Sequence, residues 1–134
     1  MDTYIIDTVA FLAYLIDQLP ENADVIFKKA EKKSIKLLLP SIALGETLYT
    51  IYKGKEIFGK EISLEKIDLI FEILQFKESI ELVDLNLDAW KIFNEIDIPE
   101  LHDRMIVALY HYYKSIAVIT TDKEIISSVP SVWN

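Results

Sequence analysis

The sequence predicts an α/β fold in which helices cover both faces of a parallel β-sheet. Four short runs have the apolar composition of buried strands: Tyr4–Ile6, which leads into Asp7 and Thr8, Ile35–Leu39, Ile80–Asp84 and Ser115–Ile119. A strand that is apolar on both faces belongs inside a sheet covered on both sides. The segments between these runs carry apolar residues at helical spacing. Strands that alternate with helices indicate a parallel sheet with right-handed crossovers.

The first predicted strand is followed by two predicted helices. Val9–Leu19 has apolar residues at helical spacing, and Pro20 stops it. Glu21–Lys33 has one apolar face. Lysines occupy its other faces, at Lys28, Lys29, Lys32 and Lys33. These lysines are either a solvated face or an edge that contacts phosphate groups.

The second predicted strand, Ile35–Leu39, ends at Pro40, after which Ser41 can cap a third helix. Glu46 lies in the second turn of this helix and is its only acid. An acid within so apolar a helix needs a partner or a function, unless it lies on an exposed polar face. Lys53–Lys60 contains two of the three glycines and is predicted to be a loop or hairpin. Leu64–Phe76 is the fourth predicted helix, with Phe71 among its periodic apolar residues.

The second half of the chain continues the alternation. After the strand Ile80–Asp84, Leu87–Ile96 is predicted to be a short helix that Asn86 caps and that turns Trp90 inward. Leu101–Tyr113 is so apolar after Arg104 that we expect it to be buried nearly all round. Its start contains Asp97, Pro99 and Glu100, which resemble a capping box. After the strand Ser115–Ile119, Thr121 and Glu124 have capping-box spacing for a short helix, and Ser128–Asn134 can supply an edge strand.

Composition limits the classes of function. With 134 residues and 51% hydrophobic content, residues 1–134 are expected to form a single domain. A net charge of −8, with Arg104 as the only arginine, makes long-range attraction to a polyanion poor, so a nucleic-acid contact must use local patches or metal ions. The lack of cysteine excludes disulfides and thiolate metal sites. No charge-free run approaches the ~20 residues that span a bilayer, so we expect a cytoplasmic protein without a membrane partner.

Four acids are placed so that they can meet. Asp7 and Asp122 follow predicted strands, whereas Glu46 and Asp103 lie near the starts of apolar helices that pack on those strands. Each acid alone has an ordinary role as a helix cap or a surface residue. Together they can face one crevice at the carboxyl edge of the sheet, where open α/β sheets bind ligands. Because crowded carboxylates repel one another, a divalent cation is expected there, and hard oxygen ligands select Mg²⁺ or Mn²⁺.

At these residues the chain resembles a known family. Asp7-Thr8, Glu46 in a helix after a strand and Pro40, Asp103 in His-Asp-Arg-Met-Ile-Val-Ala, and Asp122 in Ile-Thr-Thr-Asp are similar to the motifs of PIN-domain ribonucleases, especially VapC-type toxins of prokaryotic toxin–antitoxin modules. The resemblance covers essentially the whole chain. It implies a PIN-like three-layer α/β/α sandwich whose central parallel sheet has the strand order 3-2-1-4-5.

The resemblance also implies a function and its supporting residues. It implies metal-dependent cleavage of single-stranded or structured RNA, with Thr8 and Thr120 supporting the site. The sequence departs from the family pattern at Val9, where many members carry Ser, and at Thr121, where many carry Asn. These departures concern the fine geometry of metal binding and not the fold.

The resemblance gives the four acids roles and suggests partners. Asp7, Asp103 and Asp122 would hold Mg²⁺ or Mn²⁺, which activates a water molecule, and Glu46 would orient that water or a second ion. The expected partners are RNA, a cognate antitoxin and a second copy of the chain. A homodimer would cover the apolar side chains of Leu64–Phe76, together with Phe58 and Ile62.

Three other interpretations were weighed against this one. A haloacid-dehalogenase-type phosphatase needs a second Asp two residues after the first, and Val9 occupies that place. A phosphoacceptor receiver domain needs paired acids before its central Asp, which this order of residues does not supply. A catalytically silent PIN-like module that binds RNA or protein stays open. His102 and His111 lie within an apolar helix and are expected to be core residues whose hydrogen bonds are satisfied.

Overall fold

The computed structural model describes residues 1–134 and is built around a five-stranded sheet in the order β5-β2-β1-β6-β7. All neighbouring strands of this sheet pair in parallel. The strands are β1 (Thr3–Ile6), β2 (Lys36–Pro40), β5 (Ile80–Val83), β6 (Ala117–Ile119) and β7 (Ser131–Val132). Counted along the chain within this sheet, the order is 3-2-1-4-5, so the predicted topology is confirmed.

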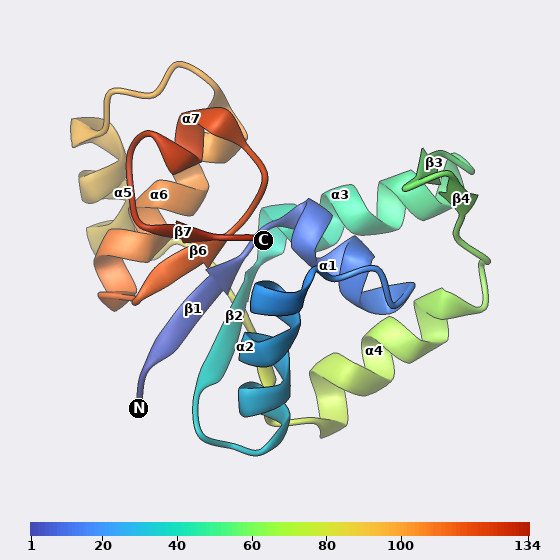
Figure 1. Ribbon diagram of the computed structural model, residues 1–134. Helices are drawn as coiled ribbons and strands as arrows, with labels where there is room; N and C mark the ends of the chain where they lie inside the picture. Colours follow the sequence, from blue (N-terminus) through green and yellow to red (C-terminus); the bar gives the residue numbers. More distant parts are fainter.

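Helices cover both faces of the sheet and complete the predicted three-layer sandwich (Figure 1). One side carries α1 (Thr8–Leu15), α2 (Glu21–Glu31), α3 (Ser41–Tyr52) and α4 (Lys66–Phe76). The other side carries α5 (Leu87–Glu95), α6 (Leu101–Tyr113) and α7 (Lys123–Ile126). No helix of the structure combines the length and the apolar character that crossing a lipid bilayer requires.

Alternation along the strands creates two separate cores. In β1, Ile6 packs into the core shared with α1 and α2, and its neighbour Ile5 packs into the core shared with α6. Successive side chains of a strand point to opposite faces, so two adjacent isoleucines can serve both layers. Each of them is fully buried. Burial of such a side chain stabilises the fold by about 1.5–3 kcal/mol.

Helix starts after the strands depend on acidic and amide side chains. Asp7 caps α1 by accepting a hydrogen bond from the backbone N–H of Ala10, and Asn86 caps α5 as predicted. Glu100 caps α6, with its side chain accepting from the N–H of Asp103. A side-chain oxygen at this position satisfies one of the N–H groups that a helix start leaves without an intrahelical partner.

Two predicted caps are wrong. Asp122, and not Thr121, caps α7, because it is the Asp122 carboxylate that reaches the backbone N–H groups of Glu124 and Ile125. Ser41 is the first residue of α3, and Pro40 stands at the cap position without a side-chain hydrogen bond. Both differences shift the start of a helix by a single residue, which sequence patterns do not resolve.

One residue that the apolar pattern turned inward is exposed. Trp90 is 41% exposed. The prediction that α6 is buried nearly all round is also wrong, because Leu101 and His111 are exposed. In α5 the small residue Ala89 is the one that is buried, and the Trp90 ring packs edge-on against Phe93 instead.

The predicted loop or hairpin between α3 and α4 is a hairpin. Its strands are β3 (Glu56–Ile57) and β4 (Lys60–Glu61), which pair antiparallel. The two turn residues, Phe58 and Gly59, both have positive φ, at 53° and 75°. Such a turn matches the twist of the two strands. The hairpin lies at the far end of α3 and α4, away from the sheet (Figure 1).

Candidate functional site

The four predicted acids line one cleft at the carboxyl edge of the sheet. β1 and β6 are neighbours and end at the same level, with Ile6 paired to Ile119. Asp7 directly follows β1, and Asp122 follows β6. The cleft has a volume of about 270 Å³ and is lined by Asp7, Thr8, Val9, Glu46, Glu100, His102, Asp103, Ile106 and Asp122. The prediction that these acids come together therefore agrees with the structure, whereas their chemical roles stay predictions.

Asp7 is the most buried of the four acids, with 6% of its surface exposed. One carboxylate oxygen accepts from the backbone N–H of Ala10 at 2.9 Å, and the other accepts from the hydroxyl of Thr120. Burial, with smaller contributions from the charges of Asp122 and Glu46, raises the pKa of Asp7 to about 6, although the hydrogen bonds from Thr120 and Ala10 act to lower it. Ionisation of Asp7 therefore costs on the order of 3 kcal/mol more in the folded protein than in the unfolded chain.

Thr120 connects the two acids that follow the strands. Its side chain is fully buried, and its Oγ1 donates to Oδ2 of Asp7. The same oxygen accepts from the backbone N–H of Asp122 at 2.9 Å. A hydroxyl can donate once and still accept, so one buried atom fixes the position of Asp7 relative to the Asp122 backbone.

Asp103 projects from the first turn of α6 toward Asp122. Partial burial, the charges of Asp122 and Glu100, and a hydrogen bond to the Asp122 side chain raise the pKa of Asp103 to about 7. Two carboxyl groups can share a hydrogen bond only when one of them carries a proton. Near neutral pH, Asp103 and Asp122 therefore share one proton in part of the molecules and carry none in the rest.

Glu46 is held by two side chains on different elements. The hydroxyl of Thr8 donates to Oε1 of Glu46 at 2.7 Å, and Nδ1 of His102 lies 3.0 Å from Oε2. Because an ionised carboxylate can only accept, Nδ1 must carry the proton of this hydrogen bond. Glu46 therefore has hydrogen-bond partners, as expected for an acid within so apolar a helix.

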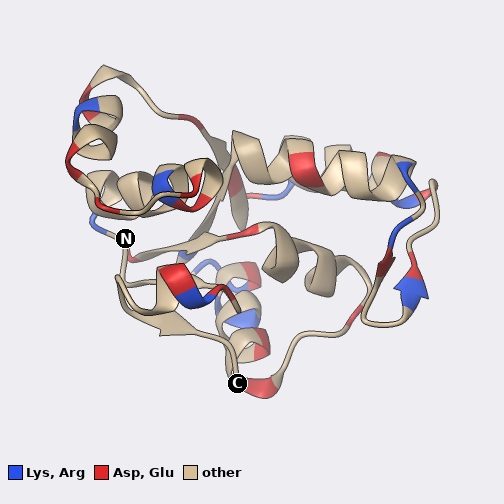
Figure 2. Ribbon diagram, turned by 90° about the horizontal axis from the view of Figure 1, so that it is seen from above, with Lys and Arg blue, Asp and Glu red and all other residues tan.

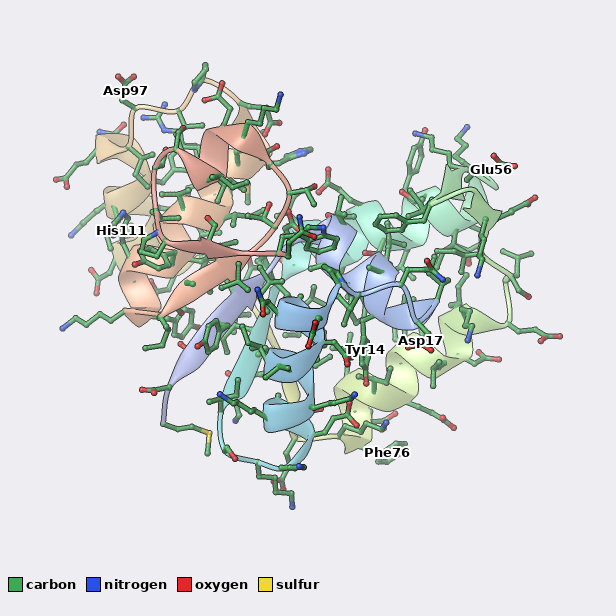
Figure 3. The ribbon with its side chains drawn as sticks, in the orientation of Figure 1. Tyr14, Asp17, Glu56, Phe76, Asp97 and His111 are labelled. Atoms are coloured by element: carbon green, nitrogen blue, oxygen red, sulfur yellow. The ribbon has the colours of Figure 1, made fainter.

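Two polar residues of the cleft were not among the residues that the sequence predicted for the site. His102 was expected in the core, but its side chain is 37% exposed and faces Glu46. The available signal was its place beside Asp103 in the first turn of α6. Glu100 also lines the cleft; burial acts to raise its pKa, but the backbone N–H groups of Asp103 and His102 outweigh it, so the pKa is lowered. His111 lies in the last turn of α6, away from the cleft (Figure 3).

The chemistry of the donors fits a hard divalent cation. No three His, Asp or Glu side chains are already arranged to hold one ion together. The cleft nevertheless offers carboxylate oxygens from several elements and no sulfur ligand. Oxygen donors of this kind suit Mg²⁺ and Mn²⁺. Burial and the charges of neighbouring acids raise the pKa values of Asp7 and Asp103, and a cation bound beside these carboxylates would act in the opposite direction.

The lysines of α2 lie elsewhere. Lys28 and Lys29 lie in the last turn of α2, and Lys32 and Lys33 follow in the connection to β2, which places all four at the amino edge of the sheet. Lys28 pairs with Asp24 at 2.8 Å, and Lys33 pairs with Glu78 at 3.5 Å. The structure favours a solvated face over an edge that contacts phosphate beside the acidic cleft.

Comparisons with known proteins agree with this fold and site. The chain is similar to a chain in the structure of VapBC2 from Rickettsia felis bound to a DNA fragment from their promoter, with 15% identity, a TM-score of 0.69, and coverage of 98% of this chain and 99% of that chain. It is also similar to a chain of a toxin–antitoxin complex from Klebsiella pneumoniae, with 14% identity, a TM-score of 0.60, and coverage of 96% and 95%. No curated protein matches the sequence. A family model for the PIN domain matches residues 4–130, and the chain therefore belongs to the PIN-domain family.

Proposed function

We propose that the protein is a metal-dependent endoribonuclease that hydrolyses phosphodiester bonds in RNA. PIN domains are generally nucleases. The observation that carries the proposal is the convergence of Asp7, Glu46, Asp103 and Asp122 in one open cleft at the carboxyl edge of the sheet. Acids with raised pKa values in a cleft are typical of catalytic sites.

In this proposal Asp7, Asp103 and Asp122 hold Mg²⁺ or Mn²⁺. A divalent cation held by these residues would supply Lewis-acid chemistry: it would lower the pKa of a water molecule and neutralise charge on the scissile phosphate. Thr120 fixes the Asp7 carboxylate through its hydrogen bond, and Thr8 and His102 orient Glu46. Each oxygen of Glu46 keeps a free lone pair, so the carboxylate can also accept from a water molecule and orient it.

We further propose that the protein is the toxin of a toxin–antitoxin pair. Its fold similarity to VapBC2 and to a toxin–antitoxin complex supports this assignment. A cognate antitoxin would then be a protein partner. The gene neighbourhood tests the idea, because a small adjacent reading frame for a DNA-binding protein is expected. Without such a neighbour, a solitary or RNA-processing nuclease becomes the better assignment.

The test of nuclease activity is cleavage of labelled single-stranded RNA by the purified protein. We expect cleavage with Mg²⁺ or Mn²⁺ and none with EDTA. Asp103→Asn keeps the size of the side chain but removes its charge, so activity should fall at least about 100-fold with the fold intact. Glu46→Gln should impair activity less if Glu46 acts through water. Asp97→Asn is the matched control, because Asp97 is exposed in the loop before α6, outside the cleft (Figure 3).

Two results would contradict the proposal. Cleavage that survives EDTA, or that Asp103→Asn leaves unchanged, would assign the activity to another site or to a contaminant. A folded protein that cleaves no RNA with either metal would favour a catalytically silent PIN-like module that binds RNA or protein. One observation favours this second candidate, namely that no three potential ligands are yet arranged around a common point.

A further inference from the structure

A second hollow adjoins the acidic cleft and runs along helix α3. It has a volume of about 420 Å³ and is lined by Ile42, Gly45, Glu46, Tyr49, Thr50, Lys55 and His102. Glu46 and His102 line both hollows, so the two meet at this pair of residues. We call this second hollow the α3 groove.

The α3 groove is the outward face of an amphipathic helix. Five of its residues repeat at the helical spacing that places side chains on one face: Ile42, Gly45, Glu46, Tyr49 and Thr50. The opposite face of α3 is buried through Ala43, Thr47 and Ile51. The groove therefore leads from the acidic cleft toward the end of α3 that carries the hairpin.

An aromatic ring and two ammonium groups lie together at that end. Tyr49 is 56% exposed. The Nζ atoms of Lys53 and Lys55 lie 5.4 and 5.5 Å from the centre of its ring. The ribbon is blue at the end of α3, and blue and red segments alternate along the hairpin (Figure 2). A sequence with net charge −8 thus places a local basic and aromatic surface beside its acidic cleft.

Gly45 has no packing reason to be glycine. It lies in the interior of α3, where glycine is disfavoured relative to alanine. A Cβ atom added to Gly45 would meet no atom within 4 Å, and its φ is not positive. The missing side chain leaves the floor of the α3 groove open between Glu46 and Ile42, which is useful to a ligand that must lie close to the helix.

We propose that the α3 groove binds the segment of single-stranded RNA that flanks the scissile phosphate. A base of the strand displaces the ammonium groups that lie over the Tyr49 ring and stacks on that ring. Lys53 and Lys55 then bind the phosphates of the adjoining nucleotides, and the strand passes over Gly45 into the acidic cleft. Aromatic stacking with lysines along the backbone is how proteins hold single strands. Tyr49 lies about 4.5 Å along the helix axis from Glu46, so the stacked base belongs to a nucleotide near the reacting phosphate. The choice of RNA as the ligand rests on the proposed function.

The binding experiment uses fluorescence anisotropy with a labelled single-stranded RNA oligonucleotide in Mg²⁺. Every variant is made in the Asp103→Asn background, so that the RNA stays intact. Tyr49→Leu should weaken binding about 5- to 100-fold, because it removes the stacking surface. Tyr52→Leu is the matched control: Tyr52 is a more exposed tyrosine of the same helix, at 71%, and it lines a different hollow.

Salt dependence separates the role of the lysines from that of the ring. The logarithm of the RNA association constant falls as the logarithm of the salt concentration rises. Lys55→Gln should make this slope less steep by about 0.7, the value for one phosphate contact with a single strand. Tyr49→Leu should leave that slope unchanged. Lys32→Gln is the control, since Lys32 is an exposed lysine in the cap of α2, at the opposite edge of the sheet.

Gly45→Leu tests the open floor of the groove. Leucine favours the helix, so the melting temperature should stay the same or rise. The added side chain should fill the groove and weaken RNA binding at least about fivefold. A loss of binding without a loss of stability is a result that a purely structural role for Gly45 does not give.

The outcomes distinguish the groove from the nuclease. If the Tyr49→Leu and Tyr52→Leu variants bind RNA equally, or if duplex RNA binds as tightly as a single strand, the α3 groove proposal is overturned. Wild-type cleavage that Tyr49→Leu, Lys55→Gln and Gly45→Leu all leave unchanged would overturn the groove and keep the nuclease. If the wild-type protein cleaves no RNA but its RNA binding depends on Tyr49, Lys55 and Gly45, the α3 groove proposal stands and the nuclease proposal is overturned.

Discussion

Nδ1 of His102 lies 3.0 Å from Oε2 of Glu46, and this contact connects α6 to α3 across the acidic cleft. The other oxygen of Glu46 is held by Thr8, which begins α1. A carboxylate held through both oxygens loses the rotation of its terminal group. The direction in which Glu46 presents its remaining lone pairs is therefore set by residues from two other helices.

We predict that His102 positions Glu46. His102→Leu should lower the rate of RNA cleavage about tenfold or more, because Glu46 loses the donor that orients it. His102→Asn keeps an N–H donor near the place of Nδ1 and should restore part of the rate. Cleavage rates of the two variants, measured with the same metal, check the prediction. Equal rates for His102→Asn and His102→Leu would speak against a role through this hydrogen bond.

The metal-free protein should lose stability as the pH rises. The pKa of Asp7 is raised to about 6 and that of Asp103 to about 7, so the folded state binds more protons than the unfolded state between about pH 4 and pH 7. Stability is then greatest below this range and falls across it. Thermal melts in EDTA at pH 5 and pH 8 check the trend. Asp103→Asn should weaken the dependence of the melting temperature on pH and should melt about 2 °C above the wild type at pH 8. Asp97→Asn should show the same pH dependence as the wild type.

Divalent cations should stabilise the protein. If Mg²⁺ or Mn²⁺ binds the folded state and not the unfolded state, it adds about 2.7 kcal/mol to the free energy of unfolding at a concentration roughly 100 times the Kd. Asp7→Asn removes one ligand and should reduce the rise in melting temperature. Scanning calorimetry with and without the metal measures both changes. Identical shifts in wild type and Asp7→Asn would remove Asp7 from the metal site.

Arg104, the only arginine, supports the fold. Its Nε donates to the backbone carbonyl of Phe93 at 2.8 Å, its Nη2 donates to that of Asn94 at 3.3 Å, and the guanidinium lies 4.8 Å from the Phe93 ring centre. These carbonyls are at the C-terminal end of α5, where intrahelical partners run out.

Arg104→Met should therefore lower the free energy of unfolding by about 1–3 kcal/mol in a denaturant titration. Arg104→Lys should recover only part of this loss, since lysine cannot reproduce the planar fork of donors. The salt dependence of RNA binding should stay as in wild type. A reduced slope in Arg104→Met would instead place Arg104 on a phosphate.

We also predict a homodimer whose interface is formed by α4 and the segment that precedes it. Leu64, Phe71 and Phe76 are 60%, 50% and 74% exposed, and Phe58 of the hairpin is 47% exposed. Such a surface is typical of an interface. Ile62, which was expected to be part of this surface, is buried, so that expectation is wrong. Figure 3 shows Phe76 at the end of α4 that lies far from Glu56 in the hairpin.

Sedimentation at micromolar concentration tests the dimer. Phe71→Glu should shift the protein to monomer, because it places a charge within an apolar contact. Trp90→Glu is the control, since Trp90 is similarly exposed but lies on α5, on the other side of the sheet. A wild-type protein that sediments only as a monomer would contradict this prediction.

The alternation of strands and helices and the position of the acids could be predicted because they depend on local patterns and one general rule. The strand order 3-2-1-4-5 came instead from the resemblance to PIN-domain ribonucleases. Apolar runs as short as Tyr4–Ile6 mark buried strands, and parallel strands end at a common edge. Any acid directly after such a strand, as Asp7 is, must lie at that edge. The helix starts were predicted less well, as Thr121 and Ser41 show, because one-residue shifts hardly change a sequence pattern.

The sequence by itself determined the alternation of strands and helices and which acids lie at the carboxyl edge of the sheet. Only the tertiary structure decided that His102 faces Glu46 and that Arg104 serves α5. It also decided that Tyr49 stays exposed beside two lysines, and that Trp90 faces solvent. His102 and Glu46 are 56 residues apart in the chain. Their contact depends on how helices from distant segments pack on opposite faces of the sheet. Periodicity shows that a helix has an apolar face, but not which neighbour covers its flanks.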